Sequence, residues 1–127
     1  MAEVKGVGGV FFLSSDPEAL GDWYKKWLGV PYTPYGASFE PKDLPIHSRS
    51  VWTPFKKDTT YFQPSKQPFM VNLIVDDVEG ALAQVKEGGA EVLPDREQGE
   101  YGEFGWFIDP EGNKVELWKP PIEAPEE

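Results

Sequence analysis

The chain has 127 residues, no cysteine, one histidine and a formal net charge of -10. This length suits one domain with a hydrophobic core, and the missing cysteines exclude disulfides, thiol nucleophiles and cysteine-based zinc sites. The acidic balance argues against nucleic acid as a partner, because phosphate neutralisation needs a basic face. The sequence shows no apolar run of membrane-spanning length and no signal-peptide pattern, so we expect a cytoplasmic protein without a membrane partner.

The first half opens with an apolar segment followed by an amphipathic helix. A strand is expected at about 8–14, within a run of apolar residues interleaved with glycines. Asp16 and Pro17 indicate the start of a helix, and Gly29 indicates its end. Apolar residues recur at helical spacing between these signals, which predicts a face that packs in the core and carries no chemistry. That face consists of Leu20, Trp23, Tyr24, Trp27 and Leu28.

The remainder of the first half predicts short strands and loops. Strand candidates are 37–39, 48–54 and 59–63, and the polar segment with two prolines at 40–47 is expected to be a loop. The stretch 64–68, with a proline at each end, has the composition of a linker.

The second half repeats the same order of signals. A strand is expected at 69–75, and Asp77 caps a second helix that ends at Gly88 and Gly89. The apolar face of this helix consists of Val78, Ala81, Leu82 and Val85. A strand at 90–93 and a polar loop at 94–99 follow.

The closing stretch 101–120 reads as strand, turn and strand. Asp109-Pro110-Glu111-Gly112-Asn113 has the composition of a tight turn. In the last strand, alternation places Val115, Leu117 and Lys119 on one face and Lys114, Glu116 and Trp118 on the other. Glu116 is therefore a carboxylate in mid-strand, either on a solvated face or inside a site.

The repeat predicts an α+β fold of two βαβββ modules that form one half-open curved sheet. The modules are expected at about 5–64 and 68–120 of a single domain, with a flexible tail at 121–127. Each module is too small to bury both faces of its own sheet. A ligand would bind in the cup that the two sheets form together.

The paired modules, the helix sequence DPEALGDWYKKWLGV and the closing DPEGNKVELWKP resemble the vicinal oxygen chelate superfamily. This group includes glyoxalase I, bleomycin-resistance proteins, fosfomycin-resistance enzymes and extradiol dioxygenases. The stretch VWTPFKKDTTYFQPSKQPFMVNLIVDDV is similar to an uncharacterised glyoxalase-like branch. The resemblance implies the fold, and it also implies a homodimer.

The resemblance further implies four equivalent strand positions that hold a divalent metal in the catalytic members. In this chain they are Gly9, Thr60, Met70 and Glu116, and only Glu116 is a ligand type that suits such a metal. His47 would have to complete the site from a loop. We therefore expect no cofactor, and we keep a rearranged metal site around Glu116 and His47 as the alternative.

Aromatic residues near the expected cup suggest a stacking surface for a flat or apolar ligand. The candidates, with Glu116 as a polar anchor, are Phe11, Trp52, Phe55, Tyr61, Phe104, Trp106 and Trp118. The leading hypothesis is a protein that binds a small aromatic or cationic molecule without metal. The alternatives are a metal-dependent lyase, isomerase or dioxygenase, and a regulatory domain whose cup is filled by its own side chains.

Overall fold

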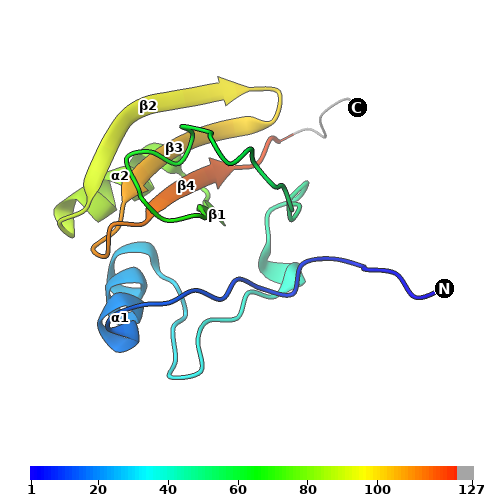
Figure 1. The fold of residues 1–127 in the computed structure, drawn as a ribbon, viewed down its shortest axis with the longest axis horizontal. Coiled ribbons are helices and arrows are strands. Elements are labelled where there is room, and N and C mark those ends of the chain that lie inside the picture. Colours follow the sequence, from blue (N-terminus) through cyan, green and yellow to red (C-terminus); the bar gives the residue numbers. More distant parts are fainter. Residues whose placement is uncertain (123–127) are drawn as a thin grey trace.

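The structure is a computed structural model, and it describes residues 1–122 (Figure 1). Helices and strands follow in the order α1 (Pro17–Leu28), η1 (Pro41–Asp43), β1 (Val71–Ile74), α2 (Val78–Glu87), β2 (Glu91–Gly99), β3 (Gly102–Ile108) and β4 (Lys114–Lys119). The predicted α+β class is confirmed, and the second half has the predicted βαβββ order. The part of the predicted tail at 123–127 lies outside the described residues.

Both α-helices begin and end at the predicted capping residues. The side chain of Asp16 accepts a hydrogen bond from the backbone N–H of Ala19 at 3.1 Å, and Asp77 accepts one from Gly80 at 2.9 Å. These contacts satisfy N–H groups that have no partner within the helix. Gly29 ends α1 with a φ of 66°, in the left-handed region that glycine adopts without a steric cost.

The four strands form one mixed sheet in the order β1-β4-β3-β2. β4 is central, parallel to β1 and antiparallel to β3. The turn between β3 and β4 closes with a 2.9 Å hydrogen bond from the N–H of Asp109 to the carbonyl of Asn113, and Gly112 has a φ of 85°. The predicted closing hairpin is therefore confirmed.

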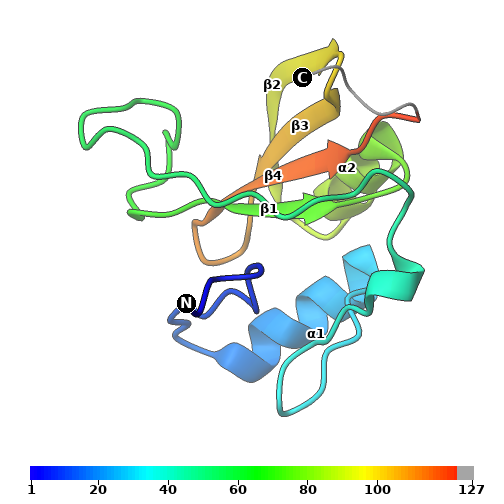
Figure 2. The same ribbon diagram turned by 90° about the vertical axis from the view of Figure 1, so that its right-hand side faces the viewer.

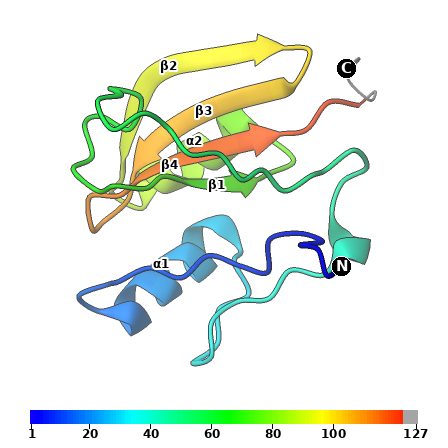
Figure 3. The ribbon, with the colours of Figure 1, turned by 45° about the vertical axis from the view of Figure 1, so that its right-hand side comes forward.

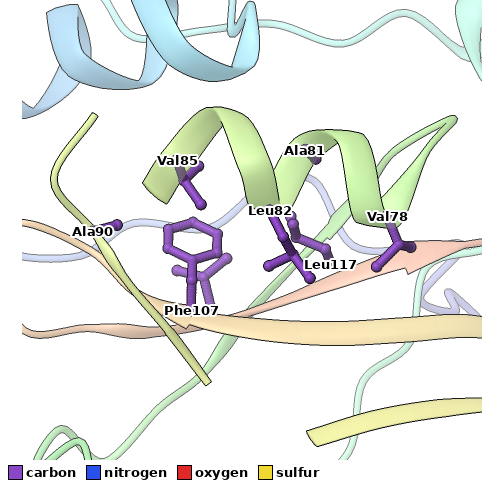
Figure 4. Packing of buried hydrophobic residues seen from close by; sticks show 8 residues of the cluster. Val78, Ala81, Leu82, Val85, Ala90, Phe107 and Leu117 are labelled. Carbon is purple, nitrogen blue, oxygen red and sulfur yellow. The ribbon is translucent and has the colours of Figure 1, made fainter. Parts of the chain in front are cut away.

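Helix α2 covers one face of the sheet (Figure 4). Phe107, Val115 and Leu117 point toward it and are almost completely buried. The core cluster consists of Val78, Ala81, Leu82, Val85, Ala90, Phe107, Val115 and Leu117. Because side chains alternate along a strand, Glu116 and Trp118 lie on the face away from α2, as predicted. In Figure 1 the segment around residue 60 passes in front of that second face.

Helix α1 lies beside α2 and below the sheet (Figures 2 and 3). Its side chains pack the first half of the chain against the second half. The indole N–H of Trp23 donates to the carbonyl of Gly88 at 2.9 Å. The hydroxyl of Tyr24 donates to the carboxylate of Asp109 at 2.9 Å. Leu20 is buried, and Trp23 and Tyr24 pack against the core cluster, so the apolar face of α1 packs as expected.

The strands predicted in the first half are wrong. Segments 8–14, 37–39, 48–54 and 59–63 form no strand, and the described chain there holds one isolated bridge, between Thr33 and Gly36. Strand-forming residues stay extended only where a neighbouring strand accepts their backbone hydrogen bonds. Segment 8–14 has no such neighbour, and Phe11 and Leu13 are both 97% exposed.

The polar loop predicted at 94–99 is also wrong, because β2 continues through it to Gly99. This part of β2 pairs with β3 from Arg96 onward, after an irregularity in register between Val92 and Arg96. Pro94 lies in that irregularity, on an edge strand, where a residue without an N–H is tolerated. The residues of this part of β2 are polar because they are exposed to solvent, and not because they form a loop.

Candidate ligand-binding site

The face of the sheet away from α2 carries a row of polar and aromatic side chains. Asn72 of β1, Glu116 of β4 and Trp106 of β3 are direct neighbours across three strands. One step along the strands, Phe104 is the neighbour of Trp118. Their rings stack at 6.0 Å with planes 3° apart.

Glu116 is 9% exposed and accepts three hydrogen bonds from side chains. The hydroxyl of Tyr61 donates to Oε2 at 2.7 Å, the indole N–H of Trp106 donates to Oε2 at 2.9 Å, and Asn72 donates to Oε1 at 2.6 Å. A buried carboxylate needs such donors to offset the loss of water. It offers about four acceptor positions, so one further donor could still bind.

Tyr61 reaches the carboxylate from a turn in the segment that crosses the face of the sheet away from α2. Its ring stacks on Phe55 at 5.5 Å and meets the edge of Trp106 at 6.3 Å. Burial raises the pKa of Tyr61, and the hydrogen bond to Glu116 raises it further. The hydroxyl therefore stays protonated at neutral pH and acts as a donor.

Lys114 adds a positive charge beside this cluster. Its Nζ donates to the backbone carbonyl of Tyr61 at 2.6 Å and lies 5.3 Å from the Tyr61 ring and 5.8 Å from the Trp106 ring. Burial lowers the pKa of Lys114, while the nearby charges of Asp95 and Glu116 oppose that shift. The lysine offsets part of the negative charge of Glu116, which makes the electrostatic potential of the cluster less negative.

The sequence model of the glyoxalase-like domain family matches residues 9–118.

This chain belongs to the glyoxalase-like domain family.

The chain is also similar to solved structures that are 23% identical to it or less. A member of the glyoxalase/bleomycin resistance protein/dioxygenase superfamily from Sphaerobacter thermophilus is 23% identical, with a TM-score of 0.51 over 94% of this chain and 98% of that chain. An antibiotic binding protein from a Streptomyces species is 23% identical, with a TM-score of 0.49 over 84% of this chain and 88% of that chain. An integron cassette protein from V. cholerae is 18% identical, with a TM-score of 0.48 over 87% and 98%.

No curated protein matches the glyoxalase-like chain. Among residues 1–122, no helix is long and apolar enough to cross a membrane.

The residues that contact Glu116 differ from those aligned with the family positions. Tyr61, Asn72 and Trp106 donate to it, whereas the family resemblance implies Thr60 and Met70 as its neighbours in the site. Gly9 lies in the N-terminal segment that forms no strand. Asn72 and Lys114 were not among the predicted site residues. Asn72 carries the same signal that singled out Glu116, since it is a polar residue inside an otherwise apolar strand.

The other predicted site residues divide into two groups. Phe55 contacts Tyr61, and Phe104 and Trp118 form their own stack, with the Trp118 indole N–H donating to the carbonyl of Tyr101 at 2.8 Å. Trp52 is 80% exposed, Phe11 is exposed, and His47 lies in a loop with a φ of 68°. Within the described residues, none of these last three contacts the Glu116 cluster through a hydrogen bond or ring contact.

The side chains around Glu116 do not fit a divalent metal. Within residues 1–122 no group of three histidine, cysteine, aspartate or glutamate side chains could hold an ion. Trp106 and Asn72 direct N–H groups at the carboxylate, and an indole N–H is a donor with no lone pair for a metal. A glyoxalase-like metal site needs two or three ligands that converge on one point, and this cluster supplies one carboxylate.

Proposed function

We propose that this glyoxalase-like protein binds a small aromatic molecule on the face of its sheet away from α2, with Glu116 as the hydrogen-bonding anchor. The observation that carries the proposal is the buried carboxylate of Glu116 between aromatic rings, with Tyr61 as a donor from a segment outside the sheet. A rigid sheet that positions a carboxylate and rings beside an irregular segment is typical of a binding site.

In the bound state, a donor group of the ligand would replace the hydroxyl of Tyr61 on Oε2 of Glu116. Trp106 would offer its ring to the ligand, and Phe104 and Trp118 would extend the stacking surface. Asn72 and the indole N–H of Trp106 would keep the carboxylate oriented. The protein would bind and hold the ligand, and we propose no chemical step.

The test is a calorimetric titration of the protein with a panel of small aromatic amines and phenols. We expect saturable binding below the millimolar range. Glu116→Gln should weaken it about tenfold or more, because a charge-assisted hydrogen bond is lost. Glu91→Gln, an exposed glutamate on β2, is the matched control and should leave the affinity unchanged.

Tyr61→Phe separates a binding role from simple damage to the fold. This variant removes the hydroxyl that competes with the ligand, so binding should be as tight or tighter, whereas a disturbed fold would weaken it. The proposal is wrong if no compound binds below the millimolar range, or if Glu116→Gln binds as well as the parent protein.

Metal-dependent lyase, isomerase or dioxygenase activity is the competing expectation from the family. The donor set around Glu116 supports binding without a metal instead. Metal analysis of protein purified without chelator decides between the two. A stoichiometric transition metal, or a melting temperature raised by adding Ni, Zn, Mn or Fe, would favour the metal-dependent function.

We also propose that the protein forms a homodimer. Phe11 and Leu13 are almost fully exposed, and β1 is an edge strand whose outer side pairs with no other described strand. An apolar segment and an open sheet edge are both stabilised by a second copy of the chain. Light scattering should give twice the 14.3 kDa monomer mass, and Leu13→Ser should shift the mass toward the monomer.

A further inference from the structure

A cavity of about 680 Å³ lies within the segment 53–70, beside the Glu116 cluster but distinct from it. Phe55, Phe62, Phe69 and Met70 supply its apolar lining. The volume is within the range of small-molecule sites. Neither Glu116 nor Trp106 lines this cavity, and Phe55 is the shared boundary, since it also stacks on Tyr61 at 5.5 Å.

The polar lining of this cavity is basic. Lys56, Lys57 and Lys66 line it, and none of the described lining residues is an aspartate or glutamate. The acidic neighbour in the sequence, Asp58, is not part of the lining. Within the described chain, no carboxylate forms an ion pair with any of the three lysines.

This local charge opposes the charge of the whole molecule. The chain carries 22 acidic and 12 basic residues, yet Asp58 is the one acid between Asp43 and Asp76. That interval contains Arg49 and the three cavity lysines. A basic cavity on an acidic protein concentrates positive potential at one place, where it attracts an anion over distance.

We propose that this cavity binds a small organic anion with an aromatic body, such as an aromatic carboxylate or sulfonate. The phenylalanine rings would stack on the ligand body, and the lysine ammonium groups would pair with its anionic group. Thr59, Ser65 and Gln67 line the same cavity and can donate hydrogen bonds to the anion. The anionic group distinguishes this ligand from the one proposed for Glu116, which brings a hydrogen-bond donor to a carboxylate.

The probe for the test is 8-anilinonaphthalene-1-sulfonate, followed by fluorescence titration of the full chain. N-phenyl-1-naphthylamine has the same ring system and amine without the sulfonate. Because an aromatic amine is also a ligand proposed for Glu116, both probes are compared in the Glu116→Gln variant, where that site is weakened. We expect one saturable site for the sulfonate, weaker binding of the neutral probe, and weaker sulfonate binding as ionic strength rises.

Lysine variants locate the site. Lys56→Gln and Lys66→Gln should each weaken sulfonate binding about two- to fivefold, the range for a solvent-exposed ion pair. Gln67→Glu, which adds a negative charge to the lining, should weaken it as well. Lys25→Gln and Lys86→Gln, on the two helices, are matched controls and should bind as the parent protein does.

Equal affinity of Glu116→Gln for the two probes, or equal affinity of the cavity and helix lysine variants for the sulfonate, would overturn the proposal. Glu116→Gln distinguishes this site from the proposed function. It should leave sulfonate binding unchanged or slightly tighter, so each site can fail its own test while the other stands.

Discussion

At the scale of single residues, Asp109 connects the two halves of the chain. This buried carboxylate accepts a hydrogen bond from the hydroxyl of Tyr24 and others from Glu111 and Asn113 in its own turn. Tyr24→Phe removes the one donor from α1. We expect a loss of about 1–3 kcal/mol in the free energy of unfolding, because a charged acceptor loses a partner. Urea denaturation measures this loss.

Tyr35→Phe is the matched control, since this tyrosine is fully exposed. The control should unfold at the same urea concentration as the parent protein. If both variants do so, the contact between Tyr24 and Asp109 contributes nothing measurable to stability.

At this scale, the site residues that can be predicted from the sequence are polar residues inside predicted strands. The sequence marks Glu116 as a carboxylate in mid-strand, and in the structure it is a buried carboxylate with three donors. Asn72 is likewise a polar residue inside a strand, but the family resemblance implies Met70 as the site position of that strand. Lys114 was placed on the correct face, but its contact with Tyr61 depends on the path of the segment around residue 60.

At the scale of elements, the distance between α2 and β3 depends on Gly105. A Cβ at this position would lie 2.9 Å from Leu82 Cδ1 and 3.0 Å from Val78 Cγ1. Gly105→Ala therefore displaces the buried side chains of Leu82 and Val78, and overpacking of this kind costs about 1–3 kcal/mol. Urea denaturation should show a lower midpoint for this variant than for the parent protein.

The control for this prediction is Gly99→Ala at the end of β2. A Cβ there would meet no heavy atom within 4 Å, so the substitution should change stability by less than about 0.5 kcal/mol. Equal losses for the two variants would show that the close approach of α2 to Gly105 does not control packing.

Elements with local signals were predictable, and elements that depend on distant partners were not. Caps at Asp16 and Asp77 fixed both helices, and the turn that begins at Asp109 fixed the closing hairpin. A strand needs a neighbour, and segment 8–14 has the composition of a strand without one. The same dependence explains β2, whose polar half pairs with β3 although its composition suggested a loop.

At the scale of the whole molecule, we expect two partly exposed tyrosines, Tyr24 and Tyr61, to lower stability at alkaline pH. Burial is the main cause that raises the pKa of both Tyr24 and Tyr61, and the charge of Asp109 and the hydrogen bond to Glu116 raise the two values further. A tyrosine in the unfolded chain ionises near pH 10. Above that pH the unfolded state therefore loses protons that the folded state keeps, and the free energy of unfolding falls as pH rises.

Lys114 changes the free energy of unfolding in the opposite direction at lower pH. Burial lowers its pKa from the usual 10.5, so below that value there is a range in which the unfolded state binds the extra proton. Stability therefore rises with pH through that range and levels off near pH 10.5. The two effects occur in different pH ranges. Lys114 no longer changes stability with pH above about 10.5, whereas the two tyrosines lower stability as pH rises above about 10.

Urea denaturation between pH 9 and 12 tests the tyrosine effect. The parent protein should lose up to about 1.4 kcal/mol per pH unit through Tyr24 once pH exceeds 10, and less through Tyr61, which is more exposed to solvent. The double variant Tyr24→Phe, Tyr61→Phe starts from a lower stability but should lose it with a shallower slope. Tyr35→Phe should keep the parent slope, because its ring is fully exposed. Parallel slopes for the parent and the double variant would mean that other groups control alkaline unfolding.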